Sequence, residues 1–147
     1  MPTATFDGLN LVARDVDATL AFYRTLGVDI PDSAIWKTGS GPHHVALGLD
    51  VQQVGWDVDS RALASHYNQA SKDDPDGART LIGFRVESRD DVDARYATLT
   101  GAGHPGAQPP YDTFWGARYA IVVDPDGRHV GIMSPVDPDR RGAPPEL

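Results

Sequence analysis

The chain of 147 residues contains no cysteine. Disulfide bonds, thiolate metal ligands and a thiol nucleophile are therefore all excluded. Basic residues are also few, with 13 Lys and Arg against 21 Asp and Glu, which gives a formal net charge of -8 at pH 7. Nucleic-acid binding needs clustered basic residues, and those of this chain are scattered. We expect a neutral or cationic small molecule as the ligand, and no nucleic acid.

Long hydrophobic runs are absent as well. No stretch approaches the ~20 apolar residues of a membrane-spanning helix. Residues 1 to 10 lack the basic start and the apolar stretch of a signal peptide. We therefore expect a cytoplasmic protein that does not bind membranes. With 40% hydrophobic residues, the chain is long enough for one compact domain with its own core.

Two stretches of the chain are related to each other at a constant spacing. Asp15-Val16-Asp17-Ala18 recurs as Asp91-Val92-Asp93-Ala94, and Gly27 recurs as Gly103. Each copy predicts a short strand, an acidic N-cap (Asp15 or Asp91), an amphipathic helix of about three turns and a closing glycine. An internal duplication of one half-domain unit explains the pattern.

The duplication divides the single domain into two modules. We place module one at about residues 6–59, a linker at 60–79, module two at 80–135 and a flexible, proline-rich tail at 136–147. Helical spacing followed by polar turn residues identifies the linker as a connection and not as a site. In module two, Asp124-Pro125-Asp126-Gly127 predicts the turn of a hairpin, since Pro presets the turn and Gly supplies the positive φ that closes it.

These features together resemble the vicinal oxygen chelate superfamily, which contains glyoxalases, bleomycin-resistance proteins and extradiol dioxygenases. The resemblance covers about residues 6–135. It implies an α+β fold in which two tandem β-α-β-β-β modules form a partly open, barrel-like sheet with a ligand cavity. The residues that carry it are Arg14-Asp15, Leu20-Ala21-Phe22-Tyr23, Leu26-Gly27, Trp115-Gly116 and the Asp124-Pro125-Asp126-Gly127 turn.

The same resemblance implies where a divalent metal would bind in the enzymes. A His or Gln on the first strand and a Glu on the last strand of each module are the usual ligands. The matching positions here are Gly8, Leu81, Gly131 and either Gly55 or Asp57. Glycine and leucine side chains have no donor atom, so at least three of the four ligands are missing. We therefore expect no metal and no other cofactor.

Two questions about these positions remain open, namely whether another metal site is present and what the glycines do. One possibility is a non-standard metal site formed by His44, His129 and Asp57, which would require these three side chains to converge. The glycines either leave room for a larger organic ligand or mark bulges and places where backbones approach closely.

Aromatic and polar side chains in the segments that border such a cavity are the candidate ligand contacts. Planar ligands stack on aromatic rings, and a few oriented polar groups fix their position. Strand alternation assigns Trp56 to the helix-facing side instead. Arg85 is expected either to pair with a carboxylate such as Asp57 or to receive an anionic ligand oxygen. The candidates are Trp36, Trp115, Tyr111, Phe114, Arg85, Asp57, Asn10, His129 and Arg118.

Two functions of different classes fit this sequence. The first is metal-independent binding and sequestration of an antibiotic or secondary metabolite, as the resemblance to bleomycin-resistance proteins implies, commonly by a homodimer. The alternative is a glyoxalase- or dioxygenase-like lyase, isomerase or oxygenase that uses a non-standard metal site or cavity groups such as His129, Asp57 and Arg85. The spacing of the residues identifies no catalytic pair. Whether the modules pair within one chain or between two chains is also open.

Overall fold

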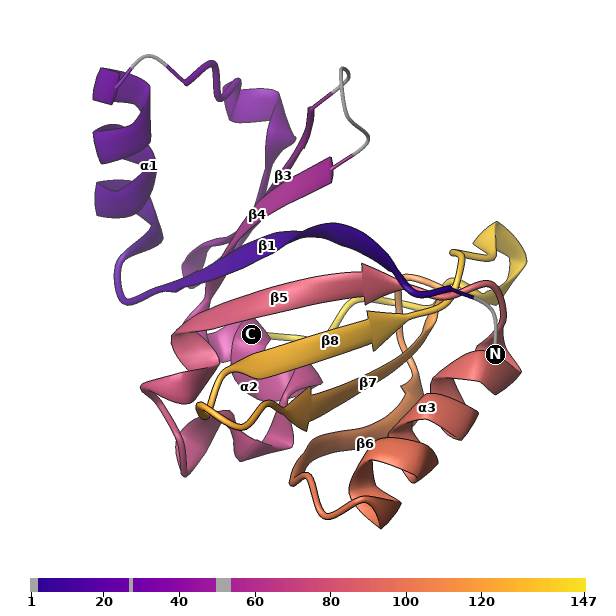
Figure 1. Ribbon diagram of the computed structural model, residues 1–147. Helices are drawn as coiled ribbons and strands as arrows, with labels where there is room; N and C mark the ends of the chain where they lie inside the picture. Colours follow the sequence, from indigo (N-terminus) through magenta and orange to yellow (C-terminus); the bar gives the residue numbers. More distant parts are fainter. Residues whose placement is uncertain (1–2, 27, 50–53) are drawn as a thin grey trace.

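The protein has the α+β architecture expected from the duplication. The structure is a computed structural model that describes residues 3–26, 28–49 and 54–147. Its strands form one sheet that is curled but not closed (Figure 1). The strands are β1 (Thr5–Ala13), β2 (Ile35–Thr38), β3 (Gly41–Leu49), β4 (Val54–Ser60), β5 (Thr80–Arg85), β6 (Gly106–Asp112), β7 (Arg118–Val123) and β8 (His129–Met133), and the α-helices are α1 (Val16–Leu26), α2 (Arg61–Tyr67) and α3 (Arg89–Gly101).

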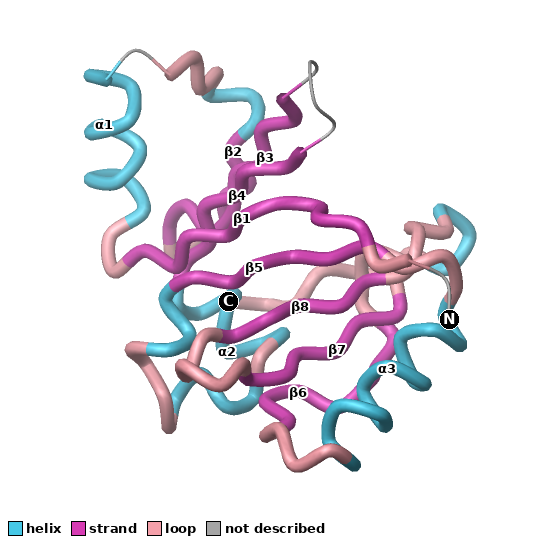
Figure 2. Tube along the Cα trace, in the orientation of Figure 1, coloured by secondary structure: helices cyan, strands magenta, loops and turns pink. Residues whose placement is uncertain are grey.

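The strand order places the two modules side by side within one chain. It runs β2-β3-β4-β1-β5-β8-β7-β6 (Figure 2). The first strand of each module pairs in parallel with the last strand of the same module, β1 with β4 and β5 with β8, and the antiparallel pair of β1 and β5 joins the modules. The predicted fold class and the two β-α-β-β-β units are confirmed, and the modules pair within the chain.

The two repeated helices start in different ways. Before α1, the Asp15 carboxylate accepts a hydrogen bond from the Ala18 N–H at 2.9 Å, as an N-cap does. Before α3 the N-cap is Ser88, whose hydroxyl accepts from the Asp91 N–H at 3.1 Å and donates to the Asp91 carboxylate at 3.0 Å. The prediction of Asp91 as the second N-cap is therefore wrong, because a Ser three residues upstream caps the helix and also bonds the Asp91 side chain.

Two of the glycines that the sequence predicts to end a helix or close a turn have the expected backbone conformation. Gly103, which follows α3, has a φ of 96°, and Gly127 in the β7–β8 turn has a φ of 85°. Both values lie in the left-handed region that favours glycine. Gly27 lies outside the described residues.

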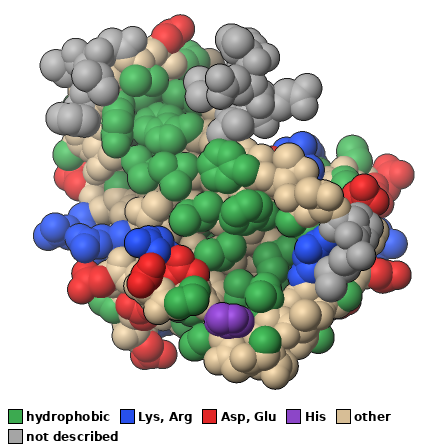
Figure 3. Space-filling view, in the orientation of Figure 1, with side chains coloured by type: hydrophobic (Ala, Val, Ile, Leu, Met, Phe, Trp, Pro, Cys, Tyr) green, Lys and Arg blue, Asp and Glu red, His purple; other side chains and the backbone are tan. Residues whose placement is uncertain are grey.

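Three hydrophobic clusters hold the helices against the two faces of the sheet. On the outer face, α1 packs on β1, β3 and β4, and α3 packs on β7 and β8. The third cluster joins α2 to the inner face of β5 and β7. Trp56 belongs to the outer cluster and meets the Tyr23 ring edge-on, with 4.8 Å between ring centroids. Its predicted orientation toward the helix is confirmed. Figure 3 shows hydrophobic side chains gathered on the outer face.

The last residues of the chain lie across the inner face, where a flexible tail was expected. The Asp137 N–H donates to the Gly116 carbonyl at 3.0 Å, and the Gly142 N–H donates to the Phe114 carbonyl at 2.8 Å. Further on, the Leu147 carbonyl accepts from the Ser40 hydroxyl at 2.5 Å. The tail therefore connects the β6–β7 loop to the β2–β3 turn. Among the described helices, none is long and apolar enough to cross a membrane.

Candidate functional site

A cavity of about 1000 Å³ lies on the inner face of the sheet. Its floor is formed by the central strands β4, β1, β5 and β8, and its other walls come from β2, β3, α2, the β6–β7 loop and the tail. In Figure 1, α2 and the C-terminus lie behind the sheet, on this inner side. The segment 60–79, expected to be a connection only, supplies Leu63 and Tyr67 to the cavity wall.

Four glycines cross the floor in one row, on four neighbouring strands. Gly8 on β1 is paired with Gly55 on β4 and with Gly83 on β5, and Gly83 is paired with Gly131 on β8. Leu81, which the family layout matches to Gly8 in module two, lies two residues before Gly83 on the same strand. Neither leucine nor glycine has a donor atom in its side chain. The residues at these positions do not fit a metal.

The glycines do not all leave space for a ligand. A Cβ on Gly8 would overlap the backbone carbonyl of Gly55, so this glycine marks a close approach of β1 and β4. A Cβ on Gly131 would lie 2.5 Å from the Tyr119 hydroxyl, whose ring already occupies that part of the floor. Next to Gly55 the nearest atom is 3.7 Å away, the Asp7 carbonyl oxygen. Of these three positions, only Gly55 leaves open space.

Aromatic rings form a continuous wall of the cavity. Trp36, Phe114 and Trp115 line it as the sequence predicts. The Phe114 ring centroid lies 5.1 Å from that of Trp115 and 6.3 Å from that of Trp36. Tyr119 continues the wall, 5.8 Å from Trp115. These mostly edge-on contacts hold the rings in place and leave faces on which a flat molecule can stack.

A polar cluster lies at one side of the aromatic wall and centres on Asp59, which is 1% exposed. Its carboxylate accepts hydrogen bonds from Asn10 Nδ2 at 3.1 Å, from the Tyr67 hydroxyl at 2.8 Å and from His44 Nδ1 at 2.5 Å. Burial raises the pKa of the Tyr67 hydroxyl well above its usual range, so Tyr67 stays protonated and remains a donor. Three donors from three elements thus satisfy one buried carboxylate.

Asp57 belongs to the same cluster but has fewer donors. Its Oδ2 accepts from Asn10 Nδ2 at 3.2 Å. Burial, with smaller effects from the neighbouring Asp59 and Asp7 charges, raises the pKa of Asp57 to about 6, although His44 and the Asn10 hydrogen bond oppose the rise. Burial alone would lower the pKa of His44, but the hydrogen bond to Asp59 and the charges of Asp59 and Asp57 outweigh this effect and raise it above 6.5. The cluster therefore raises the pKa of both cavity groups, the Asp57 carboxyl and the His44 imidazole.

His129 does not reach the cavity. It is fully buried, with Nδ1 2.8 Å from Asn68 Nδ2 and Nε2 3.0 Å from an Asp74 carboxylate oxygen. Both ring nitrogens are engaged, so this histidine links β8 to the segment after α2. The triad of His44, His129 and Asp57 is not assembled, and the described residues contain no group of three or more acidic or histidine side chains placed to hold a metal.

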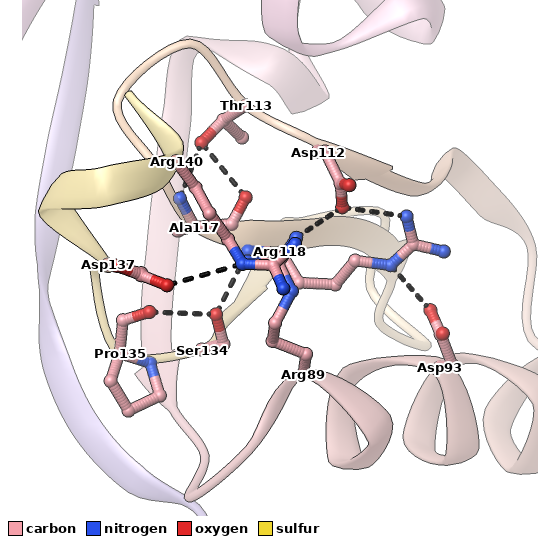
Figure 4. A network of polar contacts seen from close by, with 10 residues as sticks. All are labelled: Arg89, Asp93, Asp112, Thr113, Ala117, Arg118, Ser134, Pro135, Asp137 and Arg140. Carbon is pink, nitrogen blue, oxygen red and sulfur yellow. Dashed lines mark hydrogen bonds and ion pairs between the residues drawn. The ribbon is translucent and has the colours of Figure 1, made fainter. Parts of the chain in front are cut away.

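Arg118 and Tyr111 also lie off the cavity lining. Figure 4 shows the Arg118 guanidinium between two carboxylates, Asp93 at 2.9 Å and Asp112 at 3.0 Å. It joins β7 to α3 and to the end of β6. The Tyr111 ring packs against the outer part of the aromatic wall, 6.5 Å from the Tyr119 centroid. Burial raises the pKa of its hydroxyl, so the group stays neutral.

The remaining polar candidates reach the cavity. Asn10, Asp57 and Arg85 all line it, and Arg85 pairs with Asp7. The sequence reasoning did not identify Asp59 and Tyr67 as site residues. The alternation of Asp57 and Asp59 on one strand, which puts both on the same face, is the signal from which Asp59 was predictable.

Fold and site together define a two-module, cavity-bearing protein in which the described residues form no metal centre. Residues 5–132 match the Glyoxalase/Bleomycin resistance protein/Dioxygenase superfamily, and the chain belongs to this superfamily. A comparison with curated proteins gives no match.

Solved structures with the same fold come from several bacteria. A glyoxalase/bleomycin resistance protein/dioxygenase superfamily member from Vibrio splendidus 12B01 has a TM-score of 0.56 at 14% identity, over 90% of this chain and 100% of that one. The hypothetical protein BH1468 from Bacillus halodurans C-125 has a TM-score of 0.57 at 14% identity, over 92% and 96%. The 2,3-dioxygenase LapB from Pseudomonas sp. KL28 has a TM-score of 0.59 at 12% identity, over 90% and 42%. At these identities the likeness shows the fold alone.

Proposed function

We propose that this protein binds a small, flat organic molecule in the cavity without a metal, and so sequesters an antibiotic or a secondary metabolite. The observation that carries the proposal is the cavity itself, in which a row of four glycines without donor atoms forms part of the floor and aromatic rings form a wall. Stacking on such rings contributes about 0.5 to 1.5 kcal/mol for each contact beyond the burial of apolar area. Apolar walls with a few polar groups are typical of small-molecule sites.

Calorimetric titration with 2-naphthol in the presence of EDTA tests this proposal. We expect a dissociation constant below about 1 mM, because the two fused rings match the aromatic wall. Replacing Trp115 with leucine removes the ring that contacts Phe114 and Tyr119 and is expected to weaken binding about tenfold, which corresponds to about 1.4 kcal/mol.

The matched control is Trp56→Leu on the opposite face of the sheet. It removes the same kind of ring outside the cavity and should change the affinity less than about twofold. Equal losses in the two variants would place the ligand elsewhere. No heat of binding for 2-naphthol or other two-ring aromatics would contradict the proposal.

A further inference from the structure

We propose that Asp57 and His44 form an acid–base pair that moves a proton on a carbonyl compound held in the cavity. This activity goes beyond binding, and it rests on the proposed function only for where the ligand lies. Its substrate class is an enolisable ketone that carries an aromatic or other flat apolar ring. The ring contacts the aromatic wall and the carbonyl group meets the polar cluster.

His44 is held in the orientation that an acid catalyst needs. Its Nδ1 donates to Asp59 at 2.5 Å, and Asp59 is fixed in turn by Asn10 and Tyr67. Among the described residues Nε2 has no hydrogen-bond partner, and the His44 side chain, 33% exposed, lines the cavity. In the imidazolium form Nε2 carries a proton that it can donate to a ligand oxygen. Asp59 acts through His44 and is a positioning residue.

Asp57 supplies the base. Within the described residues its Oδ2 accepts from Asn10, whereas no hydrogen bond to Oδ1 is formed. The carboxyl group lines the same cavity as His44 and lies two residues before Asp59 on β4. The charged and titratable groups around the pair are Asp59, Tyr67, Asp7 and Arg85, with Asp7 and Arg85 paired to each other.

The protonation states near neutral pH fit these roles. The pKa of Asp57 is about 6, and that of His44 is raised above 6.5. Above a pH of about 6 Asp57 is a carboxylate, and the raised pKa of His44 favours the imidazolium, so the state that the transfer requires is a carboxylate beside an imidazolium. The rate is expected to rise with pH as Asp57 ionises and to fall at higher pH as His44 loses its proton.

The transfer balances without an oxidant or a cofactor. The C–H bond next to the carbonyl breaks, and its proton goes to the Asp57 carboxylate. The released electron pair forms a C=C bond, and the carbonyl oxygen takes a proton from His44 Nε2, which gives the enol. The reverse steps return a proton to carbon. In D2O this proton is exchanged with solvent first, so the ketone gains deuterium.

Deuterium uptake by 2-tetralone, followed by proton NMR in D2O, tests the proposal. We expect the protein to accelerate exchange next to the carbonyl at least about 100-fold over buffer, the usual range for one positioned acid or base. Asp57→Asn and His44→Asn should each return the rate to within about threefold of buffer. His104→Asn, in the loop after α3, should keep the full rate.

The Asp59→Asn variant separates positioning from simple structural support. Removing the Asp59 charge takes away the hydrogen bond and the charge that raise the pKa of His44, so the falling side of the pH–rate profile should move to lower pH. The rising side should move in the same direction by less, because for Asp57 the Asp59 charge is a smaller cause of the raised pKa than burial. If Asp59→Asn does not fold, Tyr67→Phe, which removes one donor to Asp59, replaces it and should move the same side of the profile. A loss of activity with an unmoved profile would contradict the positioning role.

The possible outcomes distinguish this activity from the proposed function. Exchange no faster than in buffer, with 2-tetralone competing against 2-naphthol for the cavity, would overturn the activity and leave the binding function standing. Full exchange in Asp57→Asn would overturn it as well, and so would binding of 2-naphthol without binding of 2-tetralone. Failure of both compounds to bind would contradict the binding function itself.

Discussion

Replacing Gly8 with alanine is expected to lower the free energy of unfolding by about 3 kcal/mol. The added Cβ would overlap the Gly55 carbonyl on β4, which is backbone and cannot rotate away. The strands β1 and β4 would have to separate at the centre of the sheet, where β1 also joins the two modules. Urea unfolding followed by circular dichroism measures the loss.

The matched control is alanine at Gly55, the partner of Gly8 in the β1–β4 pair. A Cβ there meets its nearest atom, the Asp7 carbonyl oxygen, at 3.7 Å, which is ordinary contact. The control should change stability by less than about 0.5 kcal/mol, or increase it slightly, because alanine has a smaller backbone entropy cost than glycine. Equal effects at Gly8 and Gly55 would show that the strands do not approach as closely as described.

Asp59→Ala is the second substitution with a large expected effect, a loss of about 3 to 4 kcal/mol. The buried Tyr67 hydroxyl and His44 Nδ1 would lose their acceptor, and Asn10 Nδ2 would keep only Asp57, around a carboxylate that is 1% exposed. Chemical denaturation measures the free energy, and NMR titration of His44 should show a lower pKa. A loss below about 1 kcal/mol would mean that water reaches the cluster.

Asp57→Asn is the control on the same strand, and we expect it to raise the free energy of unfolding near neutral pH. The folded state raises the pKa of Asp57 from 3.8 to about 6, so the carboxyl group binds its proton more tightly in the folded than in the unfolded protein. Wild-type stability is therefore lost as pH rises from about 4 to above 6. After a discount for partial exposure, the variant should be about 1 to 2 kcal/mol more stable at pH 7.5 and equal at pH 4. Equal stabilities at both pH values would contradict the raised pKa.

The fold was predictable because its signals are local. Asp15 caps a helix with its own side chain, and Gly127 closes a turn with its own φ. The duplication shows the same sequence pattern twice, so each copy supports the prediction made from the other. The prediction of Asp91 as an N-cap relied on the spacing of the repeat. Ser88, three residues earlier, caps the helix instead.

The site was predictable only in part, because its polar centre depends on contacts between distant segments. Trp36, Phe114 and Trp115 were found by their position in the family layout. Asp59 and Tyr67 meet through the packing of α2 on the inner face, for which the sequence gives no local signal. Burial of His129 against Asn68 and Asp74 follows from the same packing, so its assignment to the ligand site was wrong.

Elemental metal analysis of the purified protein is the most direct test of metal independence. The protein is incubated with excess Ni²⁺, Zn²⁺, Mn²⁺ or Fe²⁺ and desalted before analysis. We expect less than about a tenth of an equivalent to remain, because at least three of the four positions at which the family places metal ligands carry glycine or leucine, which have no donor atom. Retention of one equivalent that is lost in His44→Ala or Asp57→Ala would contradict the account and make this protein a metal-dependent member of its superfamily.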